Sequence, residues 1–185
     1  FNAIYHKANR LGLHRQMRQR SYSVNENFFK FWNPQMAYIL GFFCADGNVS
    51  AKLDYISLHL NSKDEHILNE IVRVMDSNHP ITTYDDSSYL RIYNKILCRD
   101  IINLGCKPKK SLTLKFPRIP SEYLSHFVRG FFDGDGSIHF NAPNTIKISF
   151  ISTSLFIKSL KKHISYILHL SGGNNFLYLI RHVKI

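Results

Sequence analysis

Apolar residues along the chain recur with the spacing of helices in some segments and with the alternation of strands in others. Asn33 is the expected N-cap of a first helix, because Pro34 follows it and is well suited to a first turn. The pattern predicts, in chain order, a helix over 34–45, a strand over 53–60, a helix over 64–75, strands over 80–84 and 88–94, and a helix over 95–104.

The same order of elements restarts 89 residues later, where Asp135-Gly136 repeats Asp46-Gly47. The second copy predicts a helix over 121–134, strands over 137–141 and 145–151, a helix over 154–169 and a strand over 176–182. The sequence therefore predicts an α+β protein with two related halves, 33–120 and 121–185.

Residues 1–32 precede the repeat and are basic. A helix is expected over 3–11, and it resembles the last helix of a helix-turn-helix or Myb-like module; an ordinary surface helix is the alternative. Residues 14–30 are expected to be a polar linker that could follow a phosphate backbone, with contacts from Arg15, Arg18 and Arg20.

The two repeated helices each carry two small residues four positions apart. Gly41 and Ala45 in the first, and Gly130 and Gly134 in the second, leave a bare stripe on one helix face. Glycine inside a helix costs about 1 kcal/mol relative to alanine, so close packing of the two helices is the expected compensation.

Each repeated helix ends in an aspartate, Asp46 or Asp135, where the helix dipole disfavours negative charge. Packing the helices side by side would bring both carboxylates together, and such a pair calls for a cation. Oxygen ligands favour Mg²⁺ or Mn²⁺ over zinc, and the main-chain carbonyls of Ala45 and Gly134 could add to the ligand set. The alternative is that each aspartate only begins a turn with the glycine that follows.

An EF-hand is a further alternative, since 133–137 looks like the start of a calcium loop. It fails because Ile138 and Asn144 stand where that loop needs glycine and a bidentate glutamate. The three cysteines, Cys44, Cys98 and Cys106, have no C-x-x-C spacing and are expected to be core thiols.

The formal charge of +11 is unevenly distributed: residues 1–32, 107–122 and 123–185 carry net charges of +5, +4 and +5, and 33–106 carries −3. Separate basic zones favour an extended polyanion such as nucleic acid, and simple solubility is the alternative. The longest apolar run, 37–45, is too short to span a membrane, and no secretory pattern is present, so an intracellular location is expected.

Segments 39–47 and 128–136 resemble the signature of the LAGLIDADG homing endonucleases, in the glycine, the last aspartate and the final glycine. The resemblance covers about 33–182 and implies a monomer with two pseudo-symmetric αββαββα halves, packed through the signature helices, whose sheets form a saddle on double-stranded DNA. It also implies that Asp46 and Asp135 bind the divalent metals that cleave DNA. The sequence departs from the family pattern in two ways. Cys44 and Asp133 occupy a signature position that is acidic in many members. The second half is expected to be incomplete at its C-terminus.

The basic segment 105–117 resembles a lysine-containing segment of that family, in which Lys110 is the expected catalytic lysine. Such a lysine would stabilise the phosphate or position water; the alternative is that the segment only binds phosphates. The other expected DNA contacts are residues of this loop and of the outward strand faces: Tyr55, Ser57, His59, Tyr89, Arg91, Tyr93, Lys107, Lys109, His139, Lys147 and Ser149. Two further alternatives are a non-cleaving relative, such as an intron maturase or a transcription regulator, and a metal-stabilised interaction protein.

Overall fold

The computed structural model describes residue 10, residues 22–141 and residues 145–170. Several predicted features lie outside the described residues: the helix expected over 3–11, the strand expected over 176–182, and the side chains of Arg15, Arg18 and Arg20. Within the described residues, no helix is both long and apolar enough to cross a bilayer.

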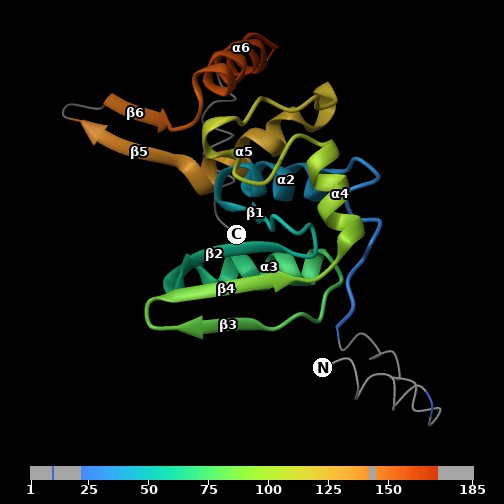
Figure 1. Cartoon of the computed structure of the whole chain (residues 1–185). Coiled ribbons are helices and arrows are strands. Elements are labelled where there is room, and N and C mark those ends of the chain that lie inside the picture. The colour runs from blue at the N-terminus through green and yellow to red at the C-terminus, as the bar shows by residue number, and fades with distance from the viewer. Residues whose placement is uncertain (1–9, 11–21, 142–144, 171–185) are drawn as a thin grey trace.

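The first half has the αββαββα order that the family resemblance implies, including a short strand β1 that the residue pattern did not predict (Figure 1). Its elements are α2 (Pro34–Asp46), β1 (Asn48–Val49), β2 (Ile56–Asn61), α3 (Glu65–Val74), β3 (Ile81–Tyr84), β4 (Ser87–Ile92) and α4 (Lys95–Asn103). The side-chain oxygen of Asn33 accepts a hydrogen bond from the Met36 amide at 2.8 Å, which confirms Asn33 as the N-cap of α2.

The four strands form an antiparallel sheet in the order β1-β2-β4-β3. On its inner face, Leu58 of β2 pairs with Leu90 of β4, and both are buried beneath α2 and α3. On the outer face, His59 pairs with Tyr89. The predicted alternation is therefore confirmed, but β2 begins later than residue 53, because residues 51–54 form a turn in which Leu53 has a φ of 55°.

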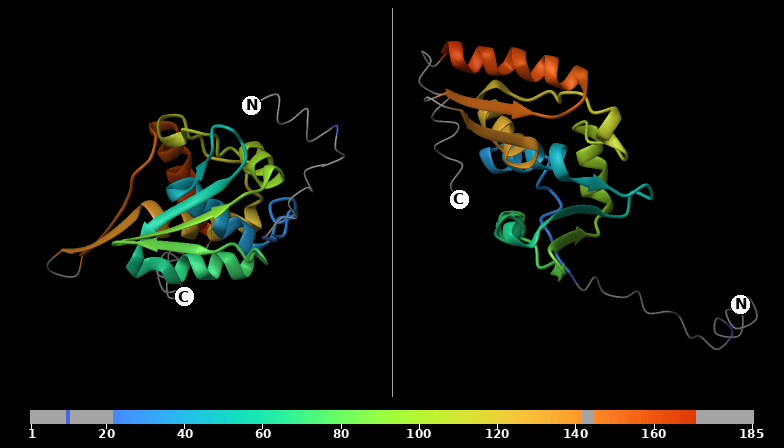
Figure 2. Two further views of the ribbon diagram at one scale, coloured as in Figure 1. Left: turned by 60° about the horizontal axis from the view of Figure 1, so that its bottom comes forward. Right: turned by 90° about the vertical axis from the view of Figure 1, so that its left-hand side faces the viewer.

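The second half begins with a short 3-10 turn and continues with α5 (Leu124–Asp135), β5 (Gly136–Asn141), β6 (Thr145–Phe150) and α6 (Ser154–Leu170). Strands β5 and β6 form an antiparallel hairpin, and α6 lies beside it (Figure 2). The rings of Phe131 on α5 and Phe156 on α6 pack 4.4 Å apart between centroids and hold these helices together.

Helices α2 and α5 pack directly against each other between the sheet of the first half and the hairpin of the second (Figure 1). A Cβ atom on Gly130 would lie 1.9 Å from the carbonyl oxygen of Tyr38, and one on Gly134 would lie 2.4 Å from the Cβ of Ala45. No larger side chain fits at these points. The small residues therefore permit the close contact between the two helices, as their spacing predicted.

Residues 22–30 are not the free linker that the polar composition suggested. Phe28 and Phe29 are buried in the core of the first half, and the Asn25 amide donates a hydrogen bond to the Met75 carbonyl at 3.0 Å. The apolar Phe pair explains the difference, because burying two phenylalanine rings outweighs the preference of the surrounding polar residues for water.

Candidate metal centre and nucleic-acid interface

Asp46 and Asp135 end the two packed helices, and each is followed by a glycine that packing requires. The Gly47 amide donates to the Phe43 carbonyl at 2.9 Å, and a Cβ atom on Gly47 would lie 2.4 Å from the Phe43 ring. The helix therefore stops with its last carboxylate at the junction of the halves. At that junction, a Cβ atom on Gly134 would lie 3.0 Å from Oδ2 of Asp46.

The two carboxylates lie in an environment that disfavours their charge. Burial raises the pKa of Asp46 above its ordinary value, and the neighbouring charge of Asp135 raises it further. Burial also raises the pKa of Asp135. The positive charge of Lys110 lowers the pKa of both groups and so offsets part of this cost. Two like charges held together beside one cation form a site that attracts further positive charge.

Lys110 is the lysine of its segment that reaches the aspartates. Its Nζ donates a hydrogen bond to the Ala45 carbonyl oxygen at 2.7 Å, one residue before Asp46. Lys109 precedes it with a φ of 57°, which starts the turn Lys110–Leu112. Lys107 and Lys109 are exposed. The Ala45 carbonyl, which we expected to be free for a metal, is therefore a hydrogen-bond acceptor for Lys110.

The residues at this junction fit a hard divalent cation better than zinc. The described residues contain no cluster of three or more His, Cys, Asp and Glu side chains suited to a metal. Two half-buried carboxylates with raised pKa values instead form the donor set. Mg²⁺ suits such a set, because it keeps several water ligands and is commonly bound through one or two carboxylates.

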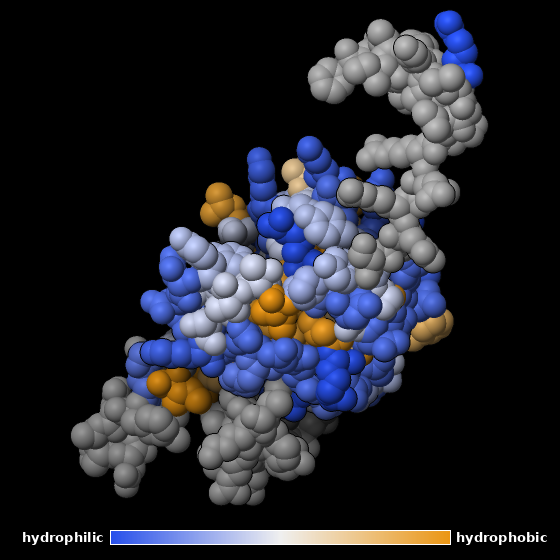
Figure 3. Space-filling model, turned by 90° about the horizontal axis from the view of Figure 1, so that it is seen from below, coloured by the Kyte–Doolittle hydropathy of each residue, from blue (hydrophilic) through white to orange (hydrophobic). Residues whose placement is uncertain are grey.

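The outer face of the first-half sheet is an aromatic and basic surface around a hollow of about 610 Å³. The rings of His59 and Tyr89 stack at 4.3 Å, and the Arg91 guanidinium lies 4.6 Å from the centre of the Tyr55 ring. The six residues predicted from strand alternation all line this hollow: Tyr55, Ser57, His59, Tyr89, Arg91 and Tyr93. Seen from below, the molecule is largely hydrophilic, with a small apolar area at its centre (Figure 3).

His59 of this surface lies near enough to Asp46 that, when protonated, it lowers the pKa of that carboxyl. On the second half, His139 is exposed on β5, and its backbone pairs with that of Lys147 on β6. Ser149 pairs with Ser137 and is half-buried. The side chain of Lys147 lies outside the described part of the structure.

A second contact between the halves was not predicted from the sequence. The Tyr38 hydroxyl donates a hydrogen bond to Oδ2 of Asp133 at 2.8 Å, and the Arg129 guanidinium lies 4.8 Å from the centre of the Tyr38 ring. Burial raises the pKa of Asp133, and the hydrogen bond from Tyr38 opposes this. Asp133 therefore joins α5 to α2 rather than facing the junction with Asp135.

Comparison with known proteins gives one family and a set of similar structures. Residues 33–102 match the model of the LAGLIDADG-like domain. Among solved structures, the chain is similar to meganuclease I-SmaMI bound to uncleavable DNA, at 15% identity over 72% of each chain, with a TM-score of 0.48. It is also similar to I-AabMI bound to uncleaved DNA, at 15% identity over 74% of this chain and 73% of that one, with a TM-score of 0.45. None of the curated proteins compared with the chain matches it.

Proposed function

We propose that the chain is a site-specific endonuclease that hydrolyses double-stranded DNA, and the match of residues 33–102 to the LAGLIDADG-like domain supports this proposal. The observation that carries this proposal is the pair Asp46 and Asp135, close enough that the charge of one raises the pKa of the other. This repulsion disfavours the fold when no cation is bound, and a divalent cation between the carboxylates would relieve it.

Asp46 and Asp135 are the proposed metal ligands, with Mg²⁺ or Mn²⁺ as the cofactor. The ion would supply positive charge to the attacking and leaving oxygens of the phosphodiester. The chain itself would position these ligands, since the packed helices α2 and α5 each end in one of the two carboxylates. We propose a monomer with internal pseudo-two-fold symmetry that acts on both DNA strands.

Lys110 is the proposed positioning and charge-stabilising residue beside the scissile phosphate. Its hydrogen bond to Ala45 holds the ammonium group next to both aspartates, where an entering phosphate would meet it. A cation held at this point would stabilise the negative charge of the transition state better than a mobile surface lysine would, because its side chain is already in place. Bound water is the proposed proton acceptor.

The outer face of the first-half sheet is the proposed DNA-binding surface. Arg91 carries a guanidinium suited to guanine, and His59 and Tyr89 offer polar groups beside it. The basic loop with Lys107 and Lys109 would contact phosphates. The positive net charge of the chain supports the same partner.

The test is cleavage of a plasmid that carries the uninterrupted insertion site of the gene encoding this chain, with Mg²⁺ present. We expect linear product from the unaltered chain and none from Asp46→Asn, with DNA binding retained by both. Asp76→Asn is the matched control, because Asp76 is exposed and its φ of 48° suits asparagine. Metal-independent binding without any cleavage would instead identify the chain as a non-cleaving relative.

A further inference from the structure

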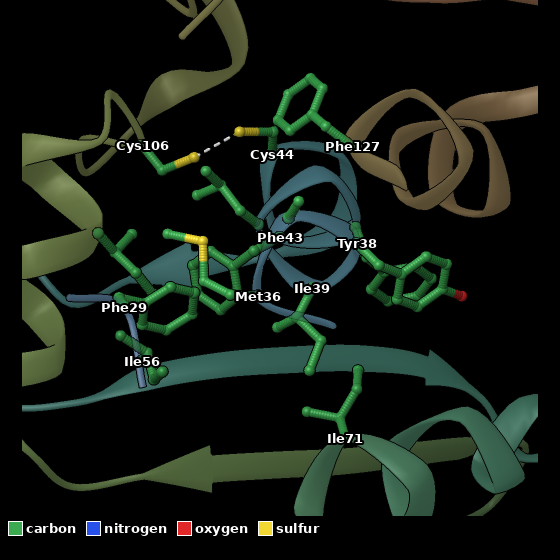
Figure 4. Packing of buried hydrophobic residues seen from close by; sticks show 14 of the residues in the cluster. Phe29, Met36, Tyr38, Ile39, Phe43, Cys44, Ile56, Ile71, Cys106 and Phe127 are labelled. Atoms are coloured by element: carbon green, nitrogen blue, oxygen red, sulfur yellow. Dashed lines mark hydrogen bonds between the residues drawn. The ribbon is translucent and has the colours of Figure 1, made fainter. Parts of the chain in front are cut away.

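Two of the three buried cysteines are in direct contact. The Sγ atoms of Cys44 and Cys106 lie 2.7 Å apart, although 62 positions separate the two residues in the chain. Both sulfur atoms point toward each other in Figure 4. Cys98 is equally buried, but the contacts of the described residues give it no sulfur partner. The pairing is therefore specific to two of three similar thiols.

The contact joins two segments that form the candidate metal centre. Cys44 lies on α2, two residues before Asp46, and Cys106 lies four residues before Lys110. Cys106 follows Gly105, whose φ of 109° turns the chain after α4, and its amide donates to the Ile101 carbonyl at 3.0 Å. These contacts fix the direction in which Cys106 enters the core.

We propose that Cys44 and Cys106 are a modification site, at which a small-molecule disulfide such as oxidised glutathione converts the two thiols into a reversible intramolecular disulfide. The thiolate of one cysteine attacks the small disulfide, which forms a mixed disulfide and releases one glutathione thiol. The second thiolate attacks that mixed disulfide, forms the Cys44–Cys106 bond and releases the second glutathione thiol. In total, the two cysteine thiols lose two protons and two electrons. Oxidised glutathione takes up these protons and electrons and becomes two glutathione thiols.

The burial of the pair determines how fast this reaction proceeds. Cys44 and Cys106 are 1% and 0% exposed. The reagent therefore reaches the sulfurs only when the structure opens locally. The segment after Cys106 is a candidate for that opening, since it is irregular and its Leu112 side chain is 91% exposed.

The experiment treats the full chain with oxidised glutathione and then blocks all remaining thiols with iodoacetamide in denaturant. We expect the intact mass to show one blocked thiol, Cys98, and peptide mapping to identify a link between Cys44 and Cys106. If dithiothreitol is added before the blocking step, it should reduce the disulfide, and all three thiols should then be blocked. The reaction should accelerate in urea concentrations below the unfolding transition, because urea favours local opening.

Single variants separate this pairing from random oxidation. Cys98→Ala should form the same link, whereas Cys44→Ala and Cys106→Ala should form no intramolecular disulfide. The oxidised chain should unfold at a temperature higher by on the order of 5–10 °C, because the link closes a long loop in the unfolded state. Three blocked thiols at every urea concentration below the transition, or equal amounts of links involving Cys98, would overturn the proposal.

Discussion

Gly41 of α2 lies directly against the carbonyl oxygen of Phe127 on α5: a Cβ atom on the glycine would come within 2.1 Å of that oxygen. Gly130 makes the reciprocal contact with the Tyr38 carbonyl. The two helices thus touch through their backbones at two points related by the internal repeat. This contact, and not a side-chain pair, determines how far apart the helix ends with Asp46 and Asp135 lie.

Gly41→Ala should therefore destabilise the chain severely, by about 3 kcal/mol or more, because the added methyl group can be accommodated only by separating two backbones. Urea unfolding measures the effect. Gly105→Ala is the comparison, since a Cβ atom there would have its nearest contact at 3.8 Å and the cost of about 1–2 kcal/mol comes from its φ of 109° alone. Equal costs at the two glycines would contradict the close backbone contact.

Asp135→Asn should stabilise the chain at pH 7. Burial and the nearby Asp46 carboxylate make a charge at this position unfavourable, and asparagine removes the charge with little change in shape. We expect a rise of about 1–3 °C in the thermal unfolding midpoint without metal. Asp76→Asn removes an exposed charge elsewhere and should shift the midpoint by less than about 1 °C. A lower midpoint for Asp135→Asn would show that the carboxylate contributes to folding.

His79 should make the stability depend on pH. Its side chain is buried, its Nδ1 lies 2.9 Å from the Ser77 hydroxyl, and burial lowers its pKa. The unfolded chain therefore binds a proton more readily, so the contribution of His79 is complete above pH 6.5 and is lost as the pH falls from that value toward the lower native pKa.

The measurement is the difference between thermal midpoints at pH 7 and pH 5. His79→Gln should reduce this difference, whatever its effect on absolute stability. His66→Gln, at an exposed position on α3, should leave it unchanged. His126 and His163 also have pKa values lowered by burial, so part of the difference should persist in the His79 variant.

The parts of the fold that sequence predicts are those fixed by local pattern. The alternation of apolar and polar residues predicted which side chains of β2 and β4 face the core. The repeated small residues predicted the contact between α2 and α5. The contact of Tyr38 with Asp133 spans 95 positions, and that of Cys44 with Cys106 spans 62. Neither leaves a periodic signal, because such pairs depend on how complete elements are arranged in space.

In the polar N-terminal segment, by contrast, the composition predicted the wrong structure. Its composition is typical of a linker, yet Phe28 and Phe29 are sufficient to attach it to the core. At the candidate site, helix ends and spacing predicted Asp46 and Asp135, and the family resemblance predicted Lys110, but only the backbone shows how Lys110 reaches the aspartates. The φ of 57° at Lys109 begins the turn that directs Lys110 toward Ala45.

Arg91 should contribute to DNA binding through both its charge and its shape. Arg91→Ala should weaken binding to the target duplex by roughly 5- to 100-fold, the range expected for loss of one base contact. Arg91→Lys should keep the salt dependence of binding but lose discrimination between target and random duplexes, because lysine lacks the planar fork. Titrations at several salt concentrations measure both quantities.

The matched control is Arg73→Ala, which removes the same charge from α3, where Arg73 pairs with Glu70 instead of facing the hollow. We expect binding of this variant to stay within about 2-fold of the unaltered chain, as the pair lies on the surface and contributes little to stability. If Arg73→Ala and Arg91→Ala weaken binding equally, the outer face of the sheet is not the DNA-binding surface.

Lys110→Gln should slow cleavage without preventing DNA binding. The glutamine side chain cannot bring a positive charge to the aspartates, so the phosphate would lose a preorganised cation beside it. Removal of one such group typically costs on the order of 100-fold in rate, which single-turnover assays with excess protein would measure. Lys109→Gln removes the same charge from the neighbouring exposed position and should slow cleavage less than about 3-fold, while lowering affinity for DNA most at low salt. Equal rate losses for the two variants would mean that the loop acts only through its total charge.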